Sequence, residues 1–468
     1  MSRRRVLTDA QITALFALPT AEADLIRHYT LDPGDMAAIA SRRRPHNRLG
    51  FALQLCALRH PGRLIRPGEL VPLEVVRFVG EQLDIDPGEL AGYAARAPTR
   101  YDHFDVLQAI FGFRRFSQPD HRALSDWLLP IALTTVSGMA VAEALMVELR
   151  RKGIIAPGAT VLERMVATAL LRAERRVANQ LTRGLTESQR NGLDTLLEIH
   201  SDHPVSSLAW VRQPPGAPGH RSLARLTDQL RHLRRIGIDP AALTAIHSDR
   251  VKQLARQGTH LTAQHLKAIS PDRRRAILLV TVLETMARLT DEAIGVFDRS
   301  IGQLFRRAER RASAALQHDA RAINDKVRLF TRIGDALLGA RETGDDPFAA
   351  VEKVISWDRL ADILQEAKGL VRADGPDYLA LAERNHALLR RIGPLFLDTF
   401  TFQGVATASG LVRAAELLRT YYAGNRRTLP GNLPRTDAGI SDAVCWNEQG
   451  EMPSVWRSQM HHLFLRLS

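Results

Sequence analysis

The residues best suited to binding a polyanion are the three consecutive arginines Arg42–Arg44, which we call the arginine turn. They stand directly before Pro45, and Arg48 follows within about one helical turn. Because proline suits the first turn of a helix, we predict that a helix over 46–59 begins beside these charges. Arginine charge, free backbone N–H groups and the helix dipole all favour phosphate at such an end. The alternative is a solvated loop, since charge runs are commonly exposed.

Catalytic chemistry is harder to place on this sequence. Metal-assisted phosphoryl transfer needs carboxylates that converge on two cations about 3.5–4 Å apart. The acidic residues instead occur where helix starts and turns are expected, as at Asp291 and Asp345. Cys56 and His60 have helical i, i+4 spacing, but two ligands are too few for a metal, and a buried thiol is the alternative. We therefore expect no catalytic residue, no metal site and no cofactor in this chain.

Two further reaction classes are disfavoured by their motifs. The sequence has no Gly-x4-Gly-Lys-Ser/Thr phosphate-binding run. His-x-x-Arg spacing, as in tyrosine recombinases, occurs at His232 and His318, but neither has a tyrosine at a short interval downstream. Arginine is frequent here, so such spacing arises easily by chance.

Composition favours nucleic acid as the partner. The 468 residues include 64 Lys and Arg against 51 Asp and Glu, a formal net charge of +13. The apolar run 276–283 is far shorter than the ~20 residues of a membrane span, so we expect no membrane partner. No apolar stretch follows the basic N-terminus, which predicts a cytoplasmic, nucleoid-associated protein. The two cysteines, Cys56 and Cys445, do not indicate a disulfide framework.

Periodicity predicts an all-α, multi-helical fold. Helix-start signals recur at Asp86-Pro87, Asp239-Pro240 and Ser270-Pro271, and strand signals are nearly absent. Short helices, among them 21–29 and 35–40, indicate tandem helix-turn-helix-like modules. We predict four regions. Two such modules occupy 1–176, and a third helical module occupies 177–260. A longer-helix scaffold or linker bundle follows over 261–424, with an apolar stripe at 294, 297, 301, 304, 305 and 308, and an aberrant, poorly ordered tail covers 425–468.

A proline- and glycine-rich turn at 213–222 is the second candidate contact. Its glycines permit close approach of backbone to phosphate, and Ser222 is predicted to begin a basic helix that reaches Ile236. Charges on both sides of the turn favour a DNA contact. The alternative is an ordinary proline-stiffened connection between domains.

Five blocks carry a resemblance to a known family, in the same order: RRPHNRLGFALQLCALRHPGR (43–63), 101–108 leading to 112–116, 155–164, 210–222 and 261–271. From Val6 to Pro430 the chain resembles the DNA-binding and scaffold half of transposases of the Tn-three (Tn3) family. The resemblance implies a ribonuclease-H-like catalytic domain with an Asp-Asp-Glu triad and divalent metal, normally Mg²⁺, beyond this chain. It also implies truncation before that domain.

The resemblance makes sequence-specific binding of terminal inverted-repeat DNA the expected function, with double-stranded DNA, full-length transposase or a second copy of the chain as partners. A repressor of transposition and an inactive helical remnant are the alternatives. Arginine suits guanine or phosphate, and asparagine suits adenine. The candidate DNA-binding residues are Arg42, Arg43, Arg44, Asn47, Arg48 and Arg63 in the first module, Arg114 and Arg115 in the second, and Arg212, His220 and Arg221 in the third.

Overall fold

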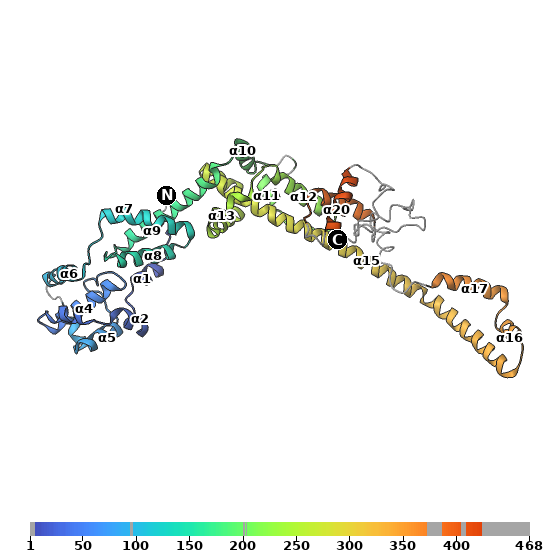
Figure 1. Ribbon diagram of the computed structural model, residues 1–468, viewed down its shortest axis with the longest axis horizontal. Helices are drawn as coiled ribbons and strands as arrows, with labels where there is room; N and C mark the ends of the chain where they lie inside the picture. Colours follow the sequence, from blue (N-terminus) through green and yellow to red (C-terminus); the bar gives the residue numbers. More distant parts are fainter. Residues whose placement is uncertain are drawn as a thin grey trace. The chain divides into compact units, whose positions relative to one another are not determined.

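A computed structural model of the chain confirms the all-α fold (Figure 1). Within the described residues, extended pairing is limited to two isolated bridges, Arg114 with Ile154 and Ile199 with Ser206. None of the described helices is both long enough and apolar enough to cross a membrane. The structure describes residues 5–93, 97–199, 202, 204–371, 386–403 and 409–423, so the predicted tail and Cys445 lie outside the described residues.

Contacts divide the chain into two units, each of which is discontinuous in sequence. The first unit contains 1–207 and 238–284, and the second contains 208–237 and 285–468. Residues 177–260, predicted as one module, are therefore divided between the two units. The predicted domain boundaries stay predictions.

The first core of unit 1 is built around one central helix, α4 (Pro45–Arg59). The predicted helices at 21–29, 35–40 and 46–59 are all present, each with boundaries shifted by two residues or fewer. We expected a single buried face on α4, but every residue from Leu49 to Leu58 is buried. Neighbouring helices pack on several of its sides. The other elements of this part are α2 (Glu22–Tyr29), α3 (Pro33–Ala40), α5 (Leu73–Leu83), the 3-10 helix η1 (Pro87–Gly92) and α6 (Ala97–Phe111).

A second core of unit 1 lies between three longer helices. They are α7 (Gln118–Thr134), α8 (Gly138–Arg151) and α9 (Ala159–Arg183), and α7 and α9 make the most extensive helix pair. Leucine, valine, methionine and alanine residues from all three helices are almost completely buried there, together with Leu7 and with Leu15 of α1 (Asp9–Phe16). This packing fixes which face of α9 is left to solvent.

The remainder of unit 1 packs through close helix contacts and ion pairs. A side chain at Gly258 of α13 would place its Cβ 1.7 Å from Thr281 Oγ1, so only glycine permits this approach. Asp194 of α10 accepts hydrogen bonds from Arg274 and Arg275 in the first turns of α15. The elements here are α10 (Glu187–Thr195), the 3-10 helix η2 (Pro240–Leu243), α13 (Ser248–His260), α14 (Ala263–Lys267) and the start of α15 (Pro271–Thr343).

Unit 2 is organised around the rest of α15 and a helix pair, α12 with α19. The apolar stripe predicted on α15 is only partly right. Phe297, Ile301 and Leu304 are buried, but Ile294 is 47% exposed because Ala293 and Val296 occupy the buried positions of that turn. Its elements are α11 (Ser207–Val211), α12 (His220–Arg234), α16 (Pro347–Val354), α17 (Trp357–Leu370), α19 (His386–Thr399) and α20 (Ser409–Ala423).

Candidate nucleic-acid interface

The arginine turn connects α3 to α4 and presents two free guanidinium groups. Arg44 is the N-cap of α4 and has extended backbone, and its side chain makes no capping hydrogen bond. Arg43 and Arg44 are exposed, and neither has an ion-pair or hydrogen-bond partner among the described side chains. Pro45 has no N–H, and the N–H groups of Asn47 and Arg48 donate to the Arg44 carbonyl, both at 3.0 Å. This end of α4 therefore offers a ligand mainly the two exposed guanidinium charges and the positive end of the helix dipole.

Arg42 and Arg48 brace this turn from behind. The guanidinium of Arg42 lies 5.4 Å from the centre of the buried Phe51 ring and donates to Ser41 Oγ at 2.8 Å. Arg48 Nε donates to the backbone carbonyl of Arg42 at 2.8 Å. These contacts hold the backbone in place, so Arg43 and Arg44 project from a fixed base.

Only the first turn of α4 is open to a ligand. Asn47 is partly exposed there, and His46 Nδ1 lies 3.8 Å from Glu89 Oε2 of η1. One turn later, a Cβ on Gly50 would lie 2.1 Å from the Tyr93 ring, so the chain after η1 closes tightly over α4. The helix can therefore present its N-terminus to DNA but cannot lay its length in a groove.

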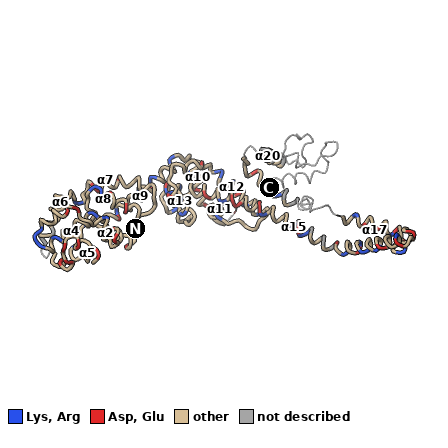
Figure 2. The backbone as a smooth tube through the Cα atoms, turned by 60° about the horizontal axis from the view of Figure 1, so that its bottom comes forward, with Lys and Arg blue, Asp and Glu red and all other residues tan. Residues whose placement is uncertain are grey.

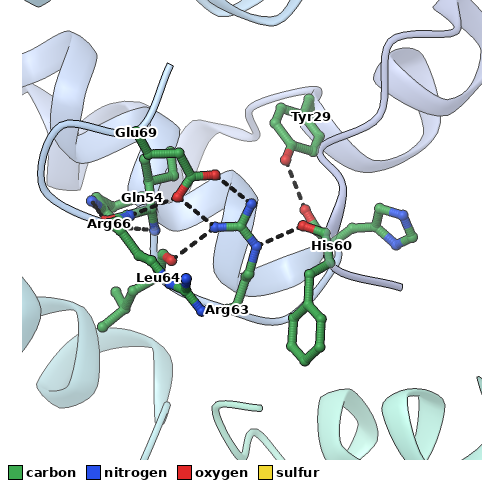
Figure 3. A network of polar contacts seen from close by, with 9 residues as sticks. Tyr29, Gln54, His60, Arg63, Leu64, Arg66 and Glu69 are labelled. Atoms are coloured by element: carbon green, nitrogen blue, oxygen red, sulfur yellow. Dashed lines mark hydrogen bonds and ion pairs between the residues drawn. The ribbon is translucent and has the colours of Figure 1, made fainter. Parts of the chain in front are cut away.

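Arg63 lies in an internal network between α4 and α5 (Figure 3). Its guanidinium donates to Glu69 Oε1 at 2.5 Å and Oε2 at 2.9 Å, and Nε donates to the Phe16 carbonyl at 2.6 Å. Hydrogen bonds from Arg63 hold the pKa of Glu69 below its usual value. The role of Arg63 on DNA stays a prediction. Its guanidinium is not part of the basic surface around Arg43 and Arg44, because its donors already bond to Glu69 and to the Phe16 carbonyl.

The two arginines of the predicted second module differ in their surroundings. Arg114 makes a two-pronged ion pair with Asp120 at 2.6 and 2.7 Å, which is the main reason that the pKa of Asp120 lies far below its usual value. Arg115 is exposed, and its guanidinium lies 4.8 Å from the centre of the Phe104 ring. Of the pair, Arg115 has its hydrogen-bond donors free for a phosphate.

The predicted third group lies in unit 2, at and before α12. Arg212 is partly buried, and burial lowers its pKa from the usual arginine value. His220 and Arg221 are exposed in the first turn of α12, which begins two residues earlier than predicted. Ser222 Oγ donates to the Ala217 carbonyl at 2.6 Å, so the proline- and glycine-rich turn folds back on the helix.

The basic helix α12 uses part of its charge internally. Arg231 pairs with Asp398 at 2.7 Å, and Arg234 donates to the Thr399 carbonyl at 2.5 Å, both at the end of α19. Lys and Arg positions are spread over the described parts of both units (Figure 2). The number of arginines on a helix therefore does not show how many are available to bind DNA, because some of them are paired within the protein.

The described residues hold no group of three or more His, Cys, Asp or Glu placed to bind a metal ion. Cys56 is buried, its thiol lies 3.9 Å from the Tyr29 carbonyl, and burial raises its pKa to about 12. His60 stacks on His28 with ring centres 4.3 Å apart. Cys56 is therefore the buried thiol of the alternative given above, and both Cys56 and His60 belong to the packing around α4.

Two histidines make the first core sensitive to acid. Burial is the main reason that the pKa values of His60 and His103 fall to about 4, from 6.5. Between these pH values the two histidines are largely protonated in the unfolded chain and neutral in the folded chain. The free energy of unfolding therefore decreases as the pH falls from 6.5 towards 4.

We expect the urea midpoint of unit 1 to fall as the pH is lowered from 6.5 to 5, a range in which carboxylates hardly titrate. The slope of the unfolding free energy against pH should correspond to at most about one proton for each histidine. Urea titrations followed by circular dichroism at each pH measure this. His60→Gln and His103→Gln should each flatten the dependence. A midpoint independent of pH in wild type would show that these rings are not shielded from water.

Comparisons with known proteins agree with the resemblance seen in the sequence. Residues 6–169 match the family described as a domain of unknown function (DUF4158). The chain is 36% identical over 455 residues to the transposase for transposon Tn21 of Escherichia coli, and 37% identical over 434 residues to the transposase for transposon Tn501 of Pseudomonas aeruginosa. These alignments cover 95% and 93% of this chain.

The chain is homologous to Tn3-family transposases. It spans 46% and 44% of the lengths of these two curated relatives, so it corresponds to less than half of each transposase. The DUF4158 match contains the first hydrophobic core of unit 1, the second core up to Ala169, the arginine turn and the pair Arg114 and Arg115.

One basic surface of this transposase homologue was missed from the sequence. It lies on the second half of α9, where every exposed residue from 175 to 183 is Arg, Asn or Gln. The signal was available as helical spacing, but these charges do not form a consecutive run.

Proposed function

We propose that this chain binds the terminal inverted-repeat DNA of a transposon as the non-catalytic, N-terminal half of a Tn3-family transposase. The observation that carries the proposal is the arginine turn, where Arg43 and Arg44 project without partners from the N-terminus of α4. The homology to transposases over more than nine tenths of the chain supports a role in transposition.

The turn suits phosphate for reasons of both charge and geometry. Two guanidinium groups can clamp adjacent phosphates at the positive end of the α4 dipole. Because α4 is buried beyond its first turn, we assign this site to positioning on the backbone, with Asn47 as the one candidate for a base edge. Arg115, Arg221 and His220 are further exposed candidates.

We place the metal-dependent strand chemistry of the family outside this chain, and we propose full-length transposase or a second copy of the chain as its protein partner. The protein would act at DNA in the bacterial cytoplasm.

Changing Arg43 and Arg44 together to alanine should weaken DNA binding and reduce the salt dependence. Each phosphate contact contributes ~0.9 to the slope of log K against log salt, so the slope should fall by up to about 2 units. Filter binding or fluorescence anisotropy on a terminal-repeat duplex, from about 50 to 200 mM salt, measures the change.

Arg77→Ala provides the matched control, because Arg77 is an exposed arginine on α5 of the same core without a described partner. It removes charge without touching the turn and should leave the slope nearly unchanged. Equal slopes for wild type and the Arg43→Ala, Arg44→Ala variant, with native helicity, would mean that the arginine turn is a solvated loop.

A further inference from the structure

The second half of α9 has a surface of unusual composition. Within 175–183 the exposed residues are Arg175, Arg176, Asn179, Gln180 and Arg183. None of the five has an ion-pair or hydrogen-bond partner among the described side chains. We call these five residues the α9 stripe.

The opposite face of the same segment is anchored. Val177, Ala178, Leu181 and Thr182 are buried. At 100° per residue, these anchors and the α9 stripe occupy opposite sides of the helix. The direction in which the stripe points is therefore set by the burial of these four residues.

Acidic residues are excluded from this face. The two carboxylates of α9 are Glu163 and Glu174, and neither lies within 175–183. Glu174 lies 3.4 Å from Arg273 and accepts from Gln253 at 3.2 Å, so it is used in packing. Ordinary solvated helix faces mix both signs of charge, whereas this one is entirely cationic or amide.

The dimensions of the α9 stripe fit a duplex. Its eight intervals extend over about 12 Å at 1.5 Å per residue, and the major groove of DNA is about 12 Å wide and admits a helix. Its residue types are those that read base edges there, since arginine pairs with guanine O6 and N7, and asparagine or glutamine with adenine N6 and N7. α4 lacks such a face because every residue from Leu49 to Leu58 is buried.

We propose that the α9 stripe is a major-groove reading surface, through which unit 1 recognises base sequence in duplex DNA. The inference deepens the proposed function and rests on it, since it assigns sequence reading to α9 and backbone positioning to the arginine turn.

The test is methylation interference on the full-length chain with a duplex that carries the terminal repeat of its own element. Methyl groups at guanine N7 lie in the major groove, so they block contacts made there. Wild type should show interfering guanines. In the Arg176→Ala, Arg183→Ala variant some of these guanines should stop interfering, and the preference for the repeat over a scrambled duplex should fall by about tenfold or more.

Asn179→Ala separates base reading from simple charge, because it removes no charge. It should lower the preference for the repeat while leaving the salt slope unchanged. The matched charge control is Arg122→Ala with Arg164→Ala, two exposed arginines on α7 and on the first half of α9. This variant should keep the wild-type interference pattern.

The possible outcomes distinguish failure of the α9 inference from failure of the proposed function. If wild type prefers the repeat but the α9 variants keep its preference and its interference pattern, the α9 inference is wrong and the proposed function stands. If wild type binds repeat and scrambled duplexes equally, with no interfering guanine, the proposed function fails and the inference fails with it. Circular dichroism should show native helicity for every variant, since exposed arginines contribute little to stability.

Discussion

Replacing Asp35 with alanine should lower the free energy of unfolding of unit 1 by about 3–5 kcal/mol, because it leaves a half-buried arginine without its partner. The Asp35 side chain is completely buried and accepts hydrogen bonds from Arg59 at 2.6 Å to each oxygen. It also accepts from the Asp32 backbone N–H at 2.9 Å in the cap of α3. The substitution thus removes an ion pair and a helix cap together.

Hydrogen–deuterium exchange of the α3 and α4 segments, combined with urea denaturation followed by circular dichroism, measures this loss. The exchange data assign it to unit 1, which matters because a chain with two units need not unfold in one step. Exchange in α3 and α4 should accelerate strongly in the variant.

Two controls make the Asp35 result interpretable. Asp126→Ala breaks the exposed pair with Arg172 and should cost less than about 1 kcal/mol. The double variant Asp35→Leu, Arg59→Met removes both charges and should recover much of the loss. A cost for Asp35→Ala as small as that for Asp126→Ala would contradict the structural role of this pair.

The second large effect expected is discrimination between DNA sequences. If α9 reads base edges while the arginine turn fixes the backbone, the chain should bind the terminal repeat ~10³-fold more tightly than a scrambled duplex at physiological salt. A protein with only the electrostatic contribution would bind both with nearly equal affinity. Competition anisotropy with labelled repeat and unlabelled competitors of equal length measures the ratio.

Raising the salt concentration provides the control for this ratio. Affinity for both duplexes should fall, but the ratio between them should persist, because base contacts release few counterions. A ratio near one at every salt concentration would contradict sequence reading.

Local signals in the sequence predicted the helix starts well. Proline after an N-cap residue marks the beginnings of η1, η2 and α15, and Pro45 marks α4. These signals work because φ at proline and the cap hydrogen bonds depend on residues within one turn. The all-α class followed from the same local information.

The burial of α4 and the partners of individual arginines could not be predicted in this way. Residues distant in sequence close over α4, as Tyr93 does at Gly50. Arg231 finds Asp398, which is 167 residues away in sequence. Such distant partners are set by tertiary packing. Even the nearer partners of Arg63 and Arg114, which are Glu69 and Asp120, lie six residues away and beyond the spacing of one helical turn. Sequence could therefore not separate the free Arg43 and Arg44 from these internally paired arginines.

The α9 stripe marks an intermediate case. Its helical spacing is visible in the sequence, but its importance depends on which face the core buries and on the absence of acid from the exposed face. The three arginines of the turn are consecutive and easily recognised, whereas the charges of the α9 stripe are separated along the sequence. Counting the sign of charge on each helix face would have found both.

Footprinting of the full-length chain on terminal-repeat DNA at about 150 mM salt tests the central claim most directly, because long-range attraction between charges is largely screened there and scrambled competitor removes binding that depends on phosphate contacts alone. The account predicts a protected tract longer than one helical turn within the repeat, which resists scrambled competitor and shrinks in the Arg176→Ala, Arg183→Ala variant. Protection that scrambled competitor removes as readily as the repeat itself would contradict recognition of transposon ends by this chain.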